Sequence, residues 1–514
     1  MQGSHSVGLV PQTLVKAATI ASIALGALLS TYFLLAPMRL VIVLGVLLVT
    51  IGLWFVPAVR RFLSAFLRWA ESHQMAVAYG LMALAVVECV VLAKSLGMDI
   101  SDEQISDAKR IWEGAQSFMS GTWPVSKSWT STLFYGVAAK CLGGRLEAAV
   151  IAGIILHFAS GALAFDTARK IGGFFAGMVA SALILFNPVL VVLSFSTATE
   201  NLYVFFLLLS FWLMTMAEKV GGVGLFRHCL LMSLAGAVLW GAVWSRGEGI
   251  VLWPVLILWI AVSACIERWP ARRVVTTCLV VVGMFAAGAA VAIGVNQRTQ
   301  GVATIFCSND NMWPRLIGAN VKFTGCTNRE DKPLIRDMMM RDGIGINGEK
   351  TKSGRDLLDF MPASSGCPPE AVPYIEAEIA RRWNGMGLCE KCRFVWRKWR
   401  IAWYGRDGVD YCRWLHPFKK RNSSPSVKMQ VFAMSFPTLI ALGGLLYYAV
   451  AAKRRTVGRI ELCLPFVLLG HFAILAVTEV SARYGVVFNV VWALPAALAL
   501  AGAGGFLRRE EERR

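Results

Sequence analysis

Charged residues are scarce in this chain. Asp, Glu, Lys and Arg make up 16% of its 514 residues, whereas soluble globular proteins carry about 25%. Hydrophobic residues make up 56%, which excludes intrinsic disorder because disordered chains are poor in apolar residues. Glycine shows no three-residue period, which excludes a collagen-like fibre, and the chain is too long for a small disulfide scaffold. The composition is that of a membrane protein.

Long apolar runs recur from one end of the sequence to the other. A helix needs roughly 20 apolar residues to cross the hydrocarbon core of a bilayer, and about twelve runs meet that criterion. We therefore predict an all-α polytopic membrane protein. The first run lacks a small-residue cleavage site, so we expect it to be retained as a span. The predicted spans are residues 13–35, 38–56, 75–96, 146–165, 174–192, 202–216, 229–243, 250–266, 274–295, 431–452, 461–477 and 485–503.

Lys and Arg are distributed unevenly among the short loops between these spans. One alternate set of loops is rich in them, and the other holds little beyond Arg39, Arg246 and Arg483. Because positively charged loops stay in the cytoplasm, we predict that both termini are cytoplasmic and that the two long polar segments lie on the opposite side, which for a bacterial inner membrane is the periplasm. Many of the basic residues behind the net charge of +19 then set the orientation of the spans and contact anionic lipids. No nucleic-acid partner is therefore expected.

The spans and the long polar segments divide the chain into four predicted parts. Residues 1–74 hold two extra N-terminal spans and a cytoplasmic connector. Residues 75–295 hold the transmembrane core, with a first periplasmic loop at 97–145. Residues 296–430 form a periplasmic loop domain of mixed structure, and residues 431–514 hold three C-terminal spans and a basic cytoplasmic tail. Near the end of the loop domain, residues 394–404 interleave Trp with Arg, a pattern typical of a helix at the lipid interface.

Half of the twelve cysteines fall in the predicted periplasmic loop domain. An even number of thiols in an oxidising compartment predicts disulfides, whose pairing the sequence leaves open. Two of them have the Cys-x-x-Cys spacing of redox and zinc sites, but no second such pair accompanies them, which favours structural disulfides over a metal. The candidates are Cys307, Cys326, Cys367, Cys389, Cys392 and Cys412.

Acidic and basic residues gather at the predicted outer ends of spans. Asp102 and Glu103 follow the third span, Glu200 opens the sixth, and Arg246 with Glu248 follows the seventh. Residues at one membrane depth can line a cavity where an enzyme meets a lipid-borne substrate. A transporter would instead place charges near mid-bilayer, and the ionisable residues inside the spans stand singly. No cofactor is indicated, and the outer acids leave a divalent metal open.

Several stretches resemble, in the same order, the GT-C superfamily of polyprenyl-phosphate-sugar-dependent integral membrane glycosyltransferases. Residues 101–114 are similar to its first outer loop. Together the matches span residues 75–505, and the resemblance is to the aminoarabinose transferase and protein O-mannosyltransferase type. The other matching stretches are residues 123–135, 168–177, 187–188, 196–200, 245–249, 316–325 and 481–484.

The resemblance implies an inverting transfer of one sugar from a polyprenyl-phosphate donor to a lipid, glycan or protein acceptor at the periplasmic face. Such a reaction needs a carboxylate to take the acceptor's proton and cations to hold the departing phosphate. By position, Asp102 is the expected base, with Glu103 second. The expected phosphate-binding residues are Lys127, Arg246 and Arg483, and the expected substrate-binding residues are Tyr135, Glu200, Glu248, Glu479 and Tyr484.

Each of these assignments has an alternative. Asp102 also suits a helix N-cap, Lys127 a lysine that reaches to the lipid interface, and Arg246 an ion-pair partner for Glu248. For the whole chain there are three alternatives. A glycan polymerase or ligase of the same membrane would not depend on Asp102, and a lipid or solute transporter would leave its substrate intact. The third alternative is a non-catalytic scaffold.

Overall fold

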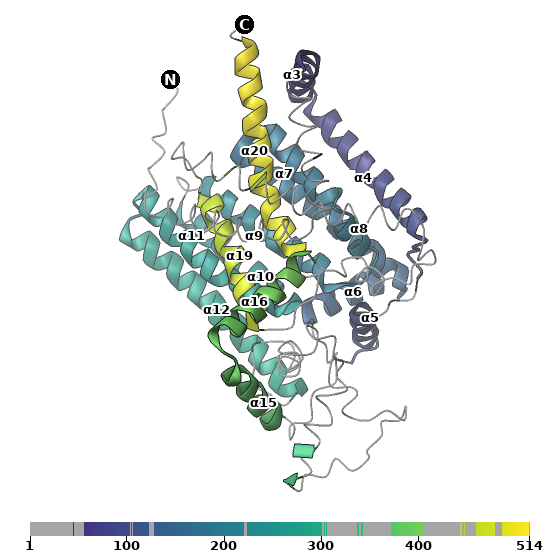
Figure 1. The fold of residues 1–514 in the computed structure, drawn as a ribbon, viewed down its shortest axis with the longest axis vertical. Helices are drawn as coiled ribbons and strands as arrows, with labels where there is room; N and C mark the ends of the chain where they lie inside the picture. The colour runs from purple at the N-terminus through teal and green to yellow at the C-terminus, as the bar shows by residue number, and fades with distance from the viewer. Residues whose placement is uncertain are drawn as a thin grey trace.

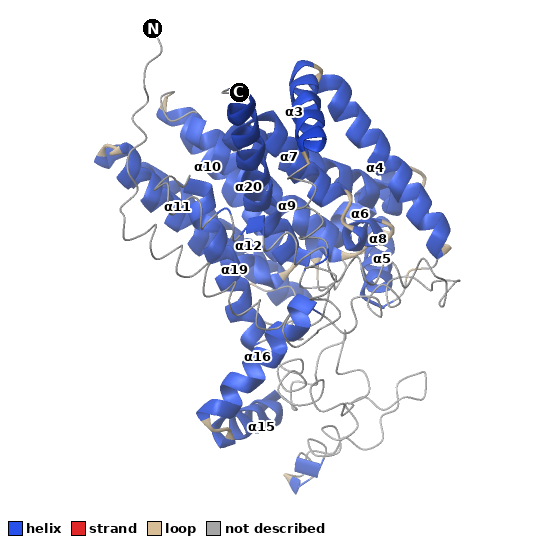
Figure 2. Cartoon of the chain, turned by 45° about the horizontal axis from the view of Figure 1, so that its top comes forward, coloured by secondary structure: helices blue, strands red, loops and turns tan. Residues whose placement is uncertain are grey.

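The computed structural model describes residue 45 and residues 56–102, 104, 106–122, 128–219, 224–300, 303, 305, 337–338, 341–342, 372–404, 443–444, 447, 459–477 and 486–512. All regular structure in this part of the chain is helical (Figure 2), as predicted. The helices are α3 (Pro57–Ser72), α4 (Gln74–Leu96), α5 (Ser106–Met119), α6 (Trp129–Cys141), α7 (Leu146–Leu185), α8 (Pro188–Ser194), α9 (Thr199–Lys219), α10 (Leu225–Ser245), the 3₁₀ turn η1 (Gly247–Val251), α11 (Leu252–Glu267), α12 (Ala271–Gln300), α15 (Val372–Gly385), α16 (Leu388–Tyr404), α19 (Arg459–Val477) and α20 (Val486–Glu512).

Six helical segments in the described residues are long and apolar enough to cross a membrane. They are Gln74–Lys94, Leu146–Leu185, Thr199–Glu218, Leu225–Ser245, Gly247–Glu267 and Ala271–Arg298. A helix satisfies its own backbone hydrogen bonds, which is what a lipid environment demands. The spans predicted at 13–35 and 38–56, and nearly all of 431–452, lie outside the described residues. The helices at the spans predicted at 461–477 and 485–503 are not among the six, so the total of about twelve stays a prediction.

Helix α7 doubles back on itself at Gly173. The φ of this residue is 86°, a left-handed value that glycine adopts without steric cost. The two arms then pack closely, because a Cβ on Gly177 would lie 2.7 Å from the carbonyl oxygen of Phe165, and the rings of Phe165 and Phe174 are 5.8 Å apart. The turn lies between the spans predicted at 146–165 and 174–192, so the chain reverses where the sequence places the break between them.

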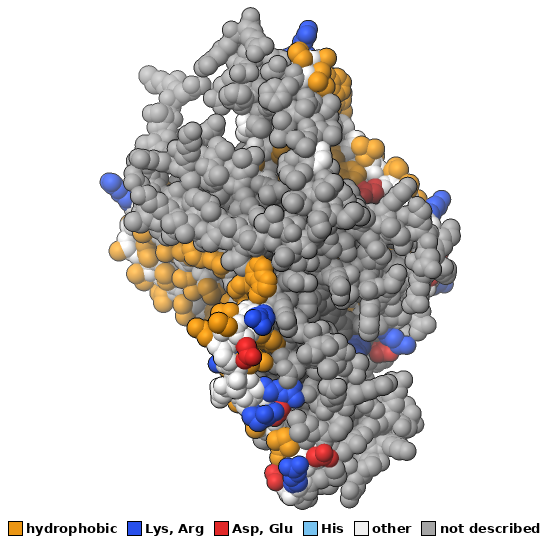
Figure 3. Space-filling view, viewed as in Figure 1, with side chains coloured by type: hydrophobic (Ala, Val, Ile, Leu, Met, Phe, Trp, Pro, Cys, Tyr) orange, Lys and Arg blue, Asp and Glu red, His pale blue; other side chains and the backbone are white. Residues whose placement is uncertain are grey.

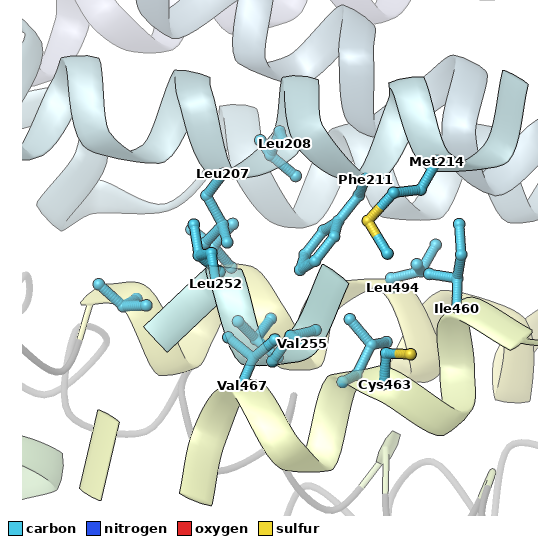
Figure 4. Packing of buried hydrophobic residues seen from close by; sticks show 14 of the residues in the cluster. Leu207, Leu208, Phe211, Met214, Leu252, Val255, Ile460, Cys463, Val467 and Leu494 are labelled. Carbon is cyan, nitrogen blue, oxygen red and sulfur yellow. The ribbon is translucent and has the colours of Figure 1, made fainter. Parts of the chain in front are cut away.

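The hydrophobic core surrounds α9. Apolar side chains from α9, α11, α19 and α20 meet there (Figure 4). This packing fixes α9, α11 and α19 relative to one another, because a close-packed interior allows little sliding. The core residues labelled in Figure 4 are Leu207, Leu208, Phe211, Met214, Leu252, Val255, Ile460, Cys463, Val467 and Leu494.

The two ends of the bundle differ. In Figure 1, α5 and α15 lie at the bottom, and α3 and the last turns of α20 lie at the top; we call these the lower and upper ends. The described parts of both long polar segments therefore share the lower end. Between the ends, the exposed face of α12 is apolar, with Val275, Leu279 and Val282 exposed, and Figure 3 shows hydrophobic side chains along this side. Apolar exposure on membrane-length helices identifies a multi-pass membrane protein.

Gly249 in η1 lets this turn lie directly against α10. A Cβ there would lie 2.7 Å from the Ala242 carbonyl carbon and the Val243 nitrogen, backbone atoms that cannot rotate away. We expect Gly249→Ala to destabilise the protein by about 1–3 kcal/mol, as overpacking does. Thermal unfolding in detergent measures this, with Gly283→Ala on α12 as control, since no atom lies within 4 Å of a Cβ there. Equal unfolding midpoints for the two variants would contradict the packing.

Candidate functional site

Arg246 joins two carboxylates where α10 ends, α9 begins and η1 follows. It ends α10 in an extended conformation, and only 8% of its side chain is exposed. Its Nη1 donates to Glu200 Oε1 at 2.5 Å, while Nη2 and Nε donate to the two oxygens of Glu248 at 3.0 and 3.3 Å. The second pair is bidentate, the geometry in which a planar guanidinium binds a carboxylate most strongly. We call Glu200, Arg246 and Glu248 the charged cluster.

Local sequence places each member of the charged cluster. Glu200 lies in the first turn of α9, where the helix dipole stabilises a negative charge, and Thr199 Oγ1 donates to its Oε2 at 3.2 Å. Glu248 lies in η1, two residues after Arg246. The ion pair between Arg246 and Glu248, considered above as an alternative role for Arg246, is therefore formed in the structure. Glu200 is a second partner that the sequence did not indicate.

Asp102 lies in a tight turn rather than at a helix start. Its Oδ2 accepts the Asp99 backbone N–H at 2.7 Å, and Asp99 Oδ1 accepts from the Ser101 backbone N–H and hydroxyl at 3.1 Å. Because α5 begins at Ser106, Asp102 is not its N-cap. The alternative that explained Asp102 as a helix cap is wrong.

Gln104 ties the Asp102 loop to the turn before α9. Its Nε2 donates to the Asp102 carbonyl at 3.2 Å, and its Oε1 accepts the Thr197 backbone N–H at 3.2 Å. The Thr197 hydroxyl in turn donates to the Ala108 carbonyl at 2.7 Å. Since Thr197 is three residues from Glu200, these bonds bring the loop that carries Asp102 to the same end of α9 as the charged cluster.

Removing the Gln104 amide should loosen this attachment. Gln104→Met keeps the side-chain volume but leaves the buried Thr197 N–H unsatisfied, which costs about 1–3 kcal/mol. We expect faster amide hydrogen exchange in peptides covering residues 99–108 and 195–198, measured by mass spectrometry. Gln116→Met, at an exposed position of α5, is the control. Unchanged exchange in both peptides would show that Gln104 does not hold the loop.

Tyr135, expected to bind substrate, is completely buried. Its hydroxyl donates to the Ala198 carbonyl at 3.2 Å and is hydrogen-bonded to the Asn201 side chain. Burial raises the pKa of Tyr135 above its ordinary value, with the nearby Glu200 carboxylate adding to the shift. In this structure the Tyr135 hydroxyl supports the turn that leads into Glu200, and substrate contact by Tyr135 stays a prediction.

One hydrogen bond beside the charged cluster was not foreseen. Tyr203 lies one turn after Glu200 on α9, and its hydroxyl is 2.6 Å from Nε2 of His471 on α19. In the sequence, His471 stands as a single ionisable residue inside a span. The sequence signal for Tyr203 is its i+3 spacing from Glu200, which places the two on one helix face.

The remaining predicted residues fall in two groups. Glu103, Lys127, Glu479, Arg483 and Tyr484 lie outside the described residues, as do Cys307, Cys326, Cys367 and Cys412. Cys389 and Cys392 lie in the first turns of α16 with free, exposed thiols, so no disulfide joins them in this structure. No group of three or more potential metal ligands occurs among the described residues.

A second set of charged residues lies at the upper end. Glu267 forms ion pairs with Arg459 at 2.6 Å and with Arg273 at 3.8 Å, and Trp259 donates to Glu218 at 3.0 Å. Glu218 and Glu200 stand near opposite ends of α9, about 27 Å apart at 1.5 Å per residue. The two charged regions are therefore separate sites.

Comparisons with known proteins give likenesses in structure alone. No protein-family model and no curated protein matches the chain. It is similar to the oligosaccharyltransferase AglB of Archaeoglobus fulgidus in complex with an inhibitory peptide and a dolichol-phosphate, at 14% identity and a TM-score of 0.48, covering 87% of this chain and 52% of that one. The apo form of the Archaeoglobus fulgidus oligosaccharyltransferase gives 15% identity and a TM-score of 0.47, covering 84% and 52%.

A third similar structure is ArnT from Cupriavidus metallidurans in the apo state, at 16% identity and a TM-score of 0.34, covering 83% of this chain and 78% of that one. The chain spans about half the length of the oligosaccharyltransferases it is similar to.

Proposed function

We propose that this protein is an inverting glycosyltransferase that moves one sugar from a polyprenyl-phosphate donor to a lipid, glycan or protein acceptor at the periplasmic face of a bacterial inner membrane. One observation carries the proposal. Glu200 and Glu248, which are far apart in the sequence, both bind Arg246, and Gln104 ties the loop that carries Asp102 to Thr197, three residues before Glu200. The lower end of the bundle carries the described parts of both long polar segments (Figure 1).

In the proposed reaction Asp102 acts as the general base. The acceptor's hydroxyl or amine attacks the anomeric carbon, its proton passes to the Asp102 carboxylate, and the bond from that carbon to the phosphate oxygen breaks. The polyprenyl phosphate leaves with the electron pair of that bond. The hydrogen bonds of Asp99 and Gln104 hold Asp102 in place, which favours a base because misplacement by about 1 Å can cost 10²-fold in rate. Glu103 is the second candidate.

Arg246 is proposed to contact the donor phosphate. Its guanidinium is fixed by Glu200 and Glu248, so it is oriented before the donor arrives, but its charge is shared with two carboxylates. We therefore propose that Lys127 and Arg483 supply further positive charge to the phosphate, and that Tyr135, Glu479 and Tyr484 contribute to substrate binding. Membrane lipids are proposed partners of α16, whose sequence interleaves Trp with Lys and Arg.

Bond cleavage distinguishes this function from transport. Purified protein in vesicles is supplied with polyprenyl-phosphate-linked sugars, tested one at a time, together with envelope lipids, glycans and peptides as acceptors. A glycosyltransferase releases free polyprenyl phosphate in a one-to-one ratio with a glycosylated product of inverted anomeric configuration. Movement of intact donor across the vesicle membrane, with no free polyprenyl phosphate, would show a transporter instead.

A further inference from the structure

Tyr203 and His471 form a buried polar contact between two spans. Tyr203 is fully buried in α9 and His471 is 3% exposed in α19, and the 2.6 Å bond between them crosses 268 residues of sequence. The apolar contacts of the hydrophobic core around this hydrogen bond have no preferred direction. A hydrogen bond fixes the register of two helices more narrowly than apolar contacts do, because it weakens steeply with misalignment.

The direction of this bond follows from the other ring nitrogen. His471 Nδ1 lies 2.7 Å from the Val467 carbonyl oxygen, which can only accept. The proton of a neutral imidazole therefore sits on Nδ1, and Nε2 accepts the Tyr203 hydroxyl proton. The hydroxyl is thus not available as a donor to a substrate, and its role is to connect the helices.

The connected helices both carry or contact the charged cluster. Tyr203 and Glu200 share one face of α9, and Glu248 and Arg246 act electrostatically on both Tyr203 and His471. Next to His471, Gly470 packs directly on Val251 of η1, where a Cβ would overlap the Val251 side chain. Glu248 lies in the same short turn η1. The position of α19 therefore bears on both acids that orient Arg246.

Helix α16 holds α19 from its other side. The indole N–H of Trp399 donates to the Phe472 carbonyl at 2.8 Å, and the two rings are 5.3 Å apart. Phe472 is the residue after His471. The described part of the predicted loop domain is thus anchored one residue from the histidine that contacts α9.

We propose that His471 is a positioning residue of the active site, which acts through Tyr203 to align Glu200 and the charged cluster for transfer, and that Trp399 supports it. This inference rests on the proposed glycosyltransferase function. Active-site groups have to be held within about 0.5 Å of their productive geometry, and this bond ties α19 directly to the face of α9 that carries Glu200.

The test compares conservative variants in the reconstituted transfer reaction. Tyr203→Phe keeps the ring and removes the hydroxyl, and His471→Leu removes the acceptor. Both are expected to lower kcat about tenfold or more with KM for the polyprenyl-phosphate sugar unchanged within about twofold, since a shift of 1 Å or less affects the transition state most. His471→Gln places an amide oxygen near the position of Nε2 and should retain kcat within about threefold, which a loss of packing alone would not allow.

Ser210→Ala is the matched control. It removes a buried hydroxyl from the same helix, but one that bonds within α9, to Leu207, so kcat should not change. Trp399→Phe should lower kcat in the same direction as Tyr203→Phe but less. Thermal unfolding of each variant reports whether it folds. If His471→Leu does not fold, the kcat of Tyr203→Phe alone tests the positioning role.

The outcomes separate the two proposals. If the wild type transfers sugar and Tyr203→Phe keeps the wild-type kcat, or if His471→Gln is as slow as His471→Leu, the positioning role is refuted and the transferase stands. If the wild-type protein transfers no sugar from any polyprenyl-phosphate donor, the proposed function itself fails and the positioning role falls with it.

Discussion

Asp102→Asn is expected to lower the rate of sugar transfer by at least about 10²-fold, the usual effect of removing a general base. The substitution suits the site because the asparagine oxygen can still accept the Asp99 N–H that Asp102 accepts at 2.7 Å. The turn should therefore keep its shape and the donor should still bind. Initial rates with a polyprenyl-phosphate sugar, measured beside the affinity for the donor, separate chemistry from binding.

Asp99→Asn is the control for this experiment. Asp99 lies in the same turn, and its carboxylate accepts from Ser101, so the variant removes one negative charge nearby without removing the proposed base. We expect its rate to stay within about threefold of wild type, as for a rim charge. Turnover that is unchanged in Asp102→Asn would remove Asp102 from the mechanism and leave Glu103 as the remaining candidate in this loop.

Arg246→Ala is expected to have the largest effect on stability. The variant leaves Glu200 and Glu248 without their shared guanidinium, and breaking a buried ion pair in this way costs about 3–5 kcal/mol. Arg246→Lys should fall between wild type and alanine, because an ammonium cannot reproduce the bidentate pair with Glu248. Thermal unfolding in detergent at neutral pH measures the order of the three proteins.

Structural and phosphate-binding roles of Arg246 can be separated by neutralising its partners. Arg246→Met combined with Glu200→Gln and Glu248→Gln removes the buried charges together, so much of the lost stability should return, as when buried ion pairs are replaced as a unit. Binding of polyprenyl phosphate should stay weak in this variant and should be weaker than in Asp102→Asn. Equal donor affinity in wild type, Asp102→Asn and the triple variant would refute phosphate binding by Arg246.

Six membrane-length helices could be predicted because an apolar run in lipid has to satisfy its own backbone. The paired glycines at 172 and 173 end the gap between the spans predicted at 146–165 and 174–192, and the chain reverses there. Arg246 drew notice as a rare basic residue outside the basic set of loops, and Glu248 could be paired with it because the two are only two residues apart.

Contacts between segments that are distant in the sequence could not be predicted from the apolar runs or from the local spacing of charged residues. The bond from Gln104 to Thr197 spans 93 residues and that from Tyr203 to His471 spans 268. Both depend on how the helices pack, and one sequence carries no signal for such a pairing. Tyr135 was singled out by its place in a family-like motif, and the sequence carried no signal that its hydroxyl donates to the Ala198 carbonyl, 63 residues away.

Photoaffinity labelling with a polyprenyl phosphate that carries a photoreactive group beside the phosphate tests the central claim most directly. The account predicts label in peptides that contain residues 99–104, 197–203 and 244–251, lost when unlabelled polyprenyl phosphate is added in excess and reduced in Arg246→Lys. Label confined to the upper end around Glu267 and Arg459, or label that excess lipid does not compete away, would contradict a donor site at the charged cluster.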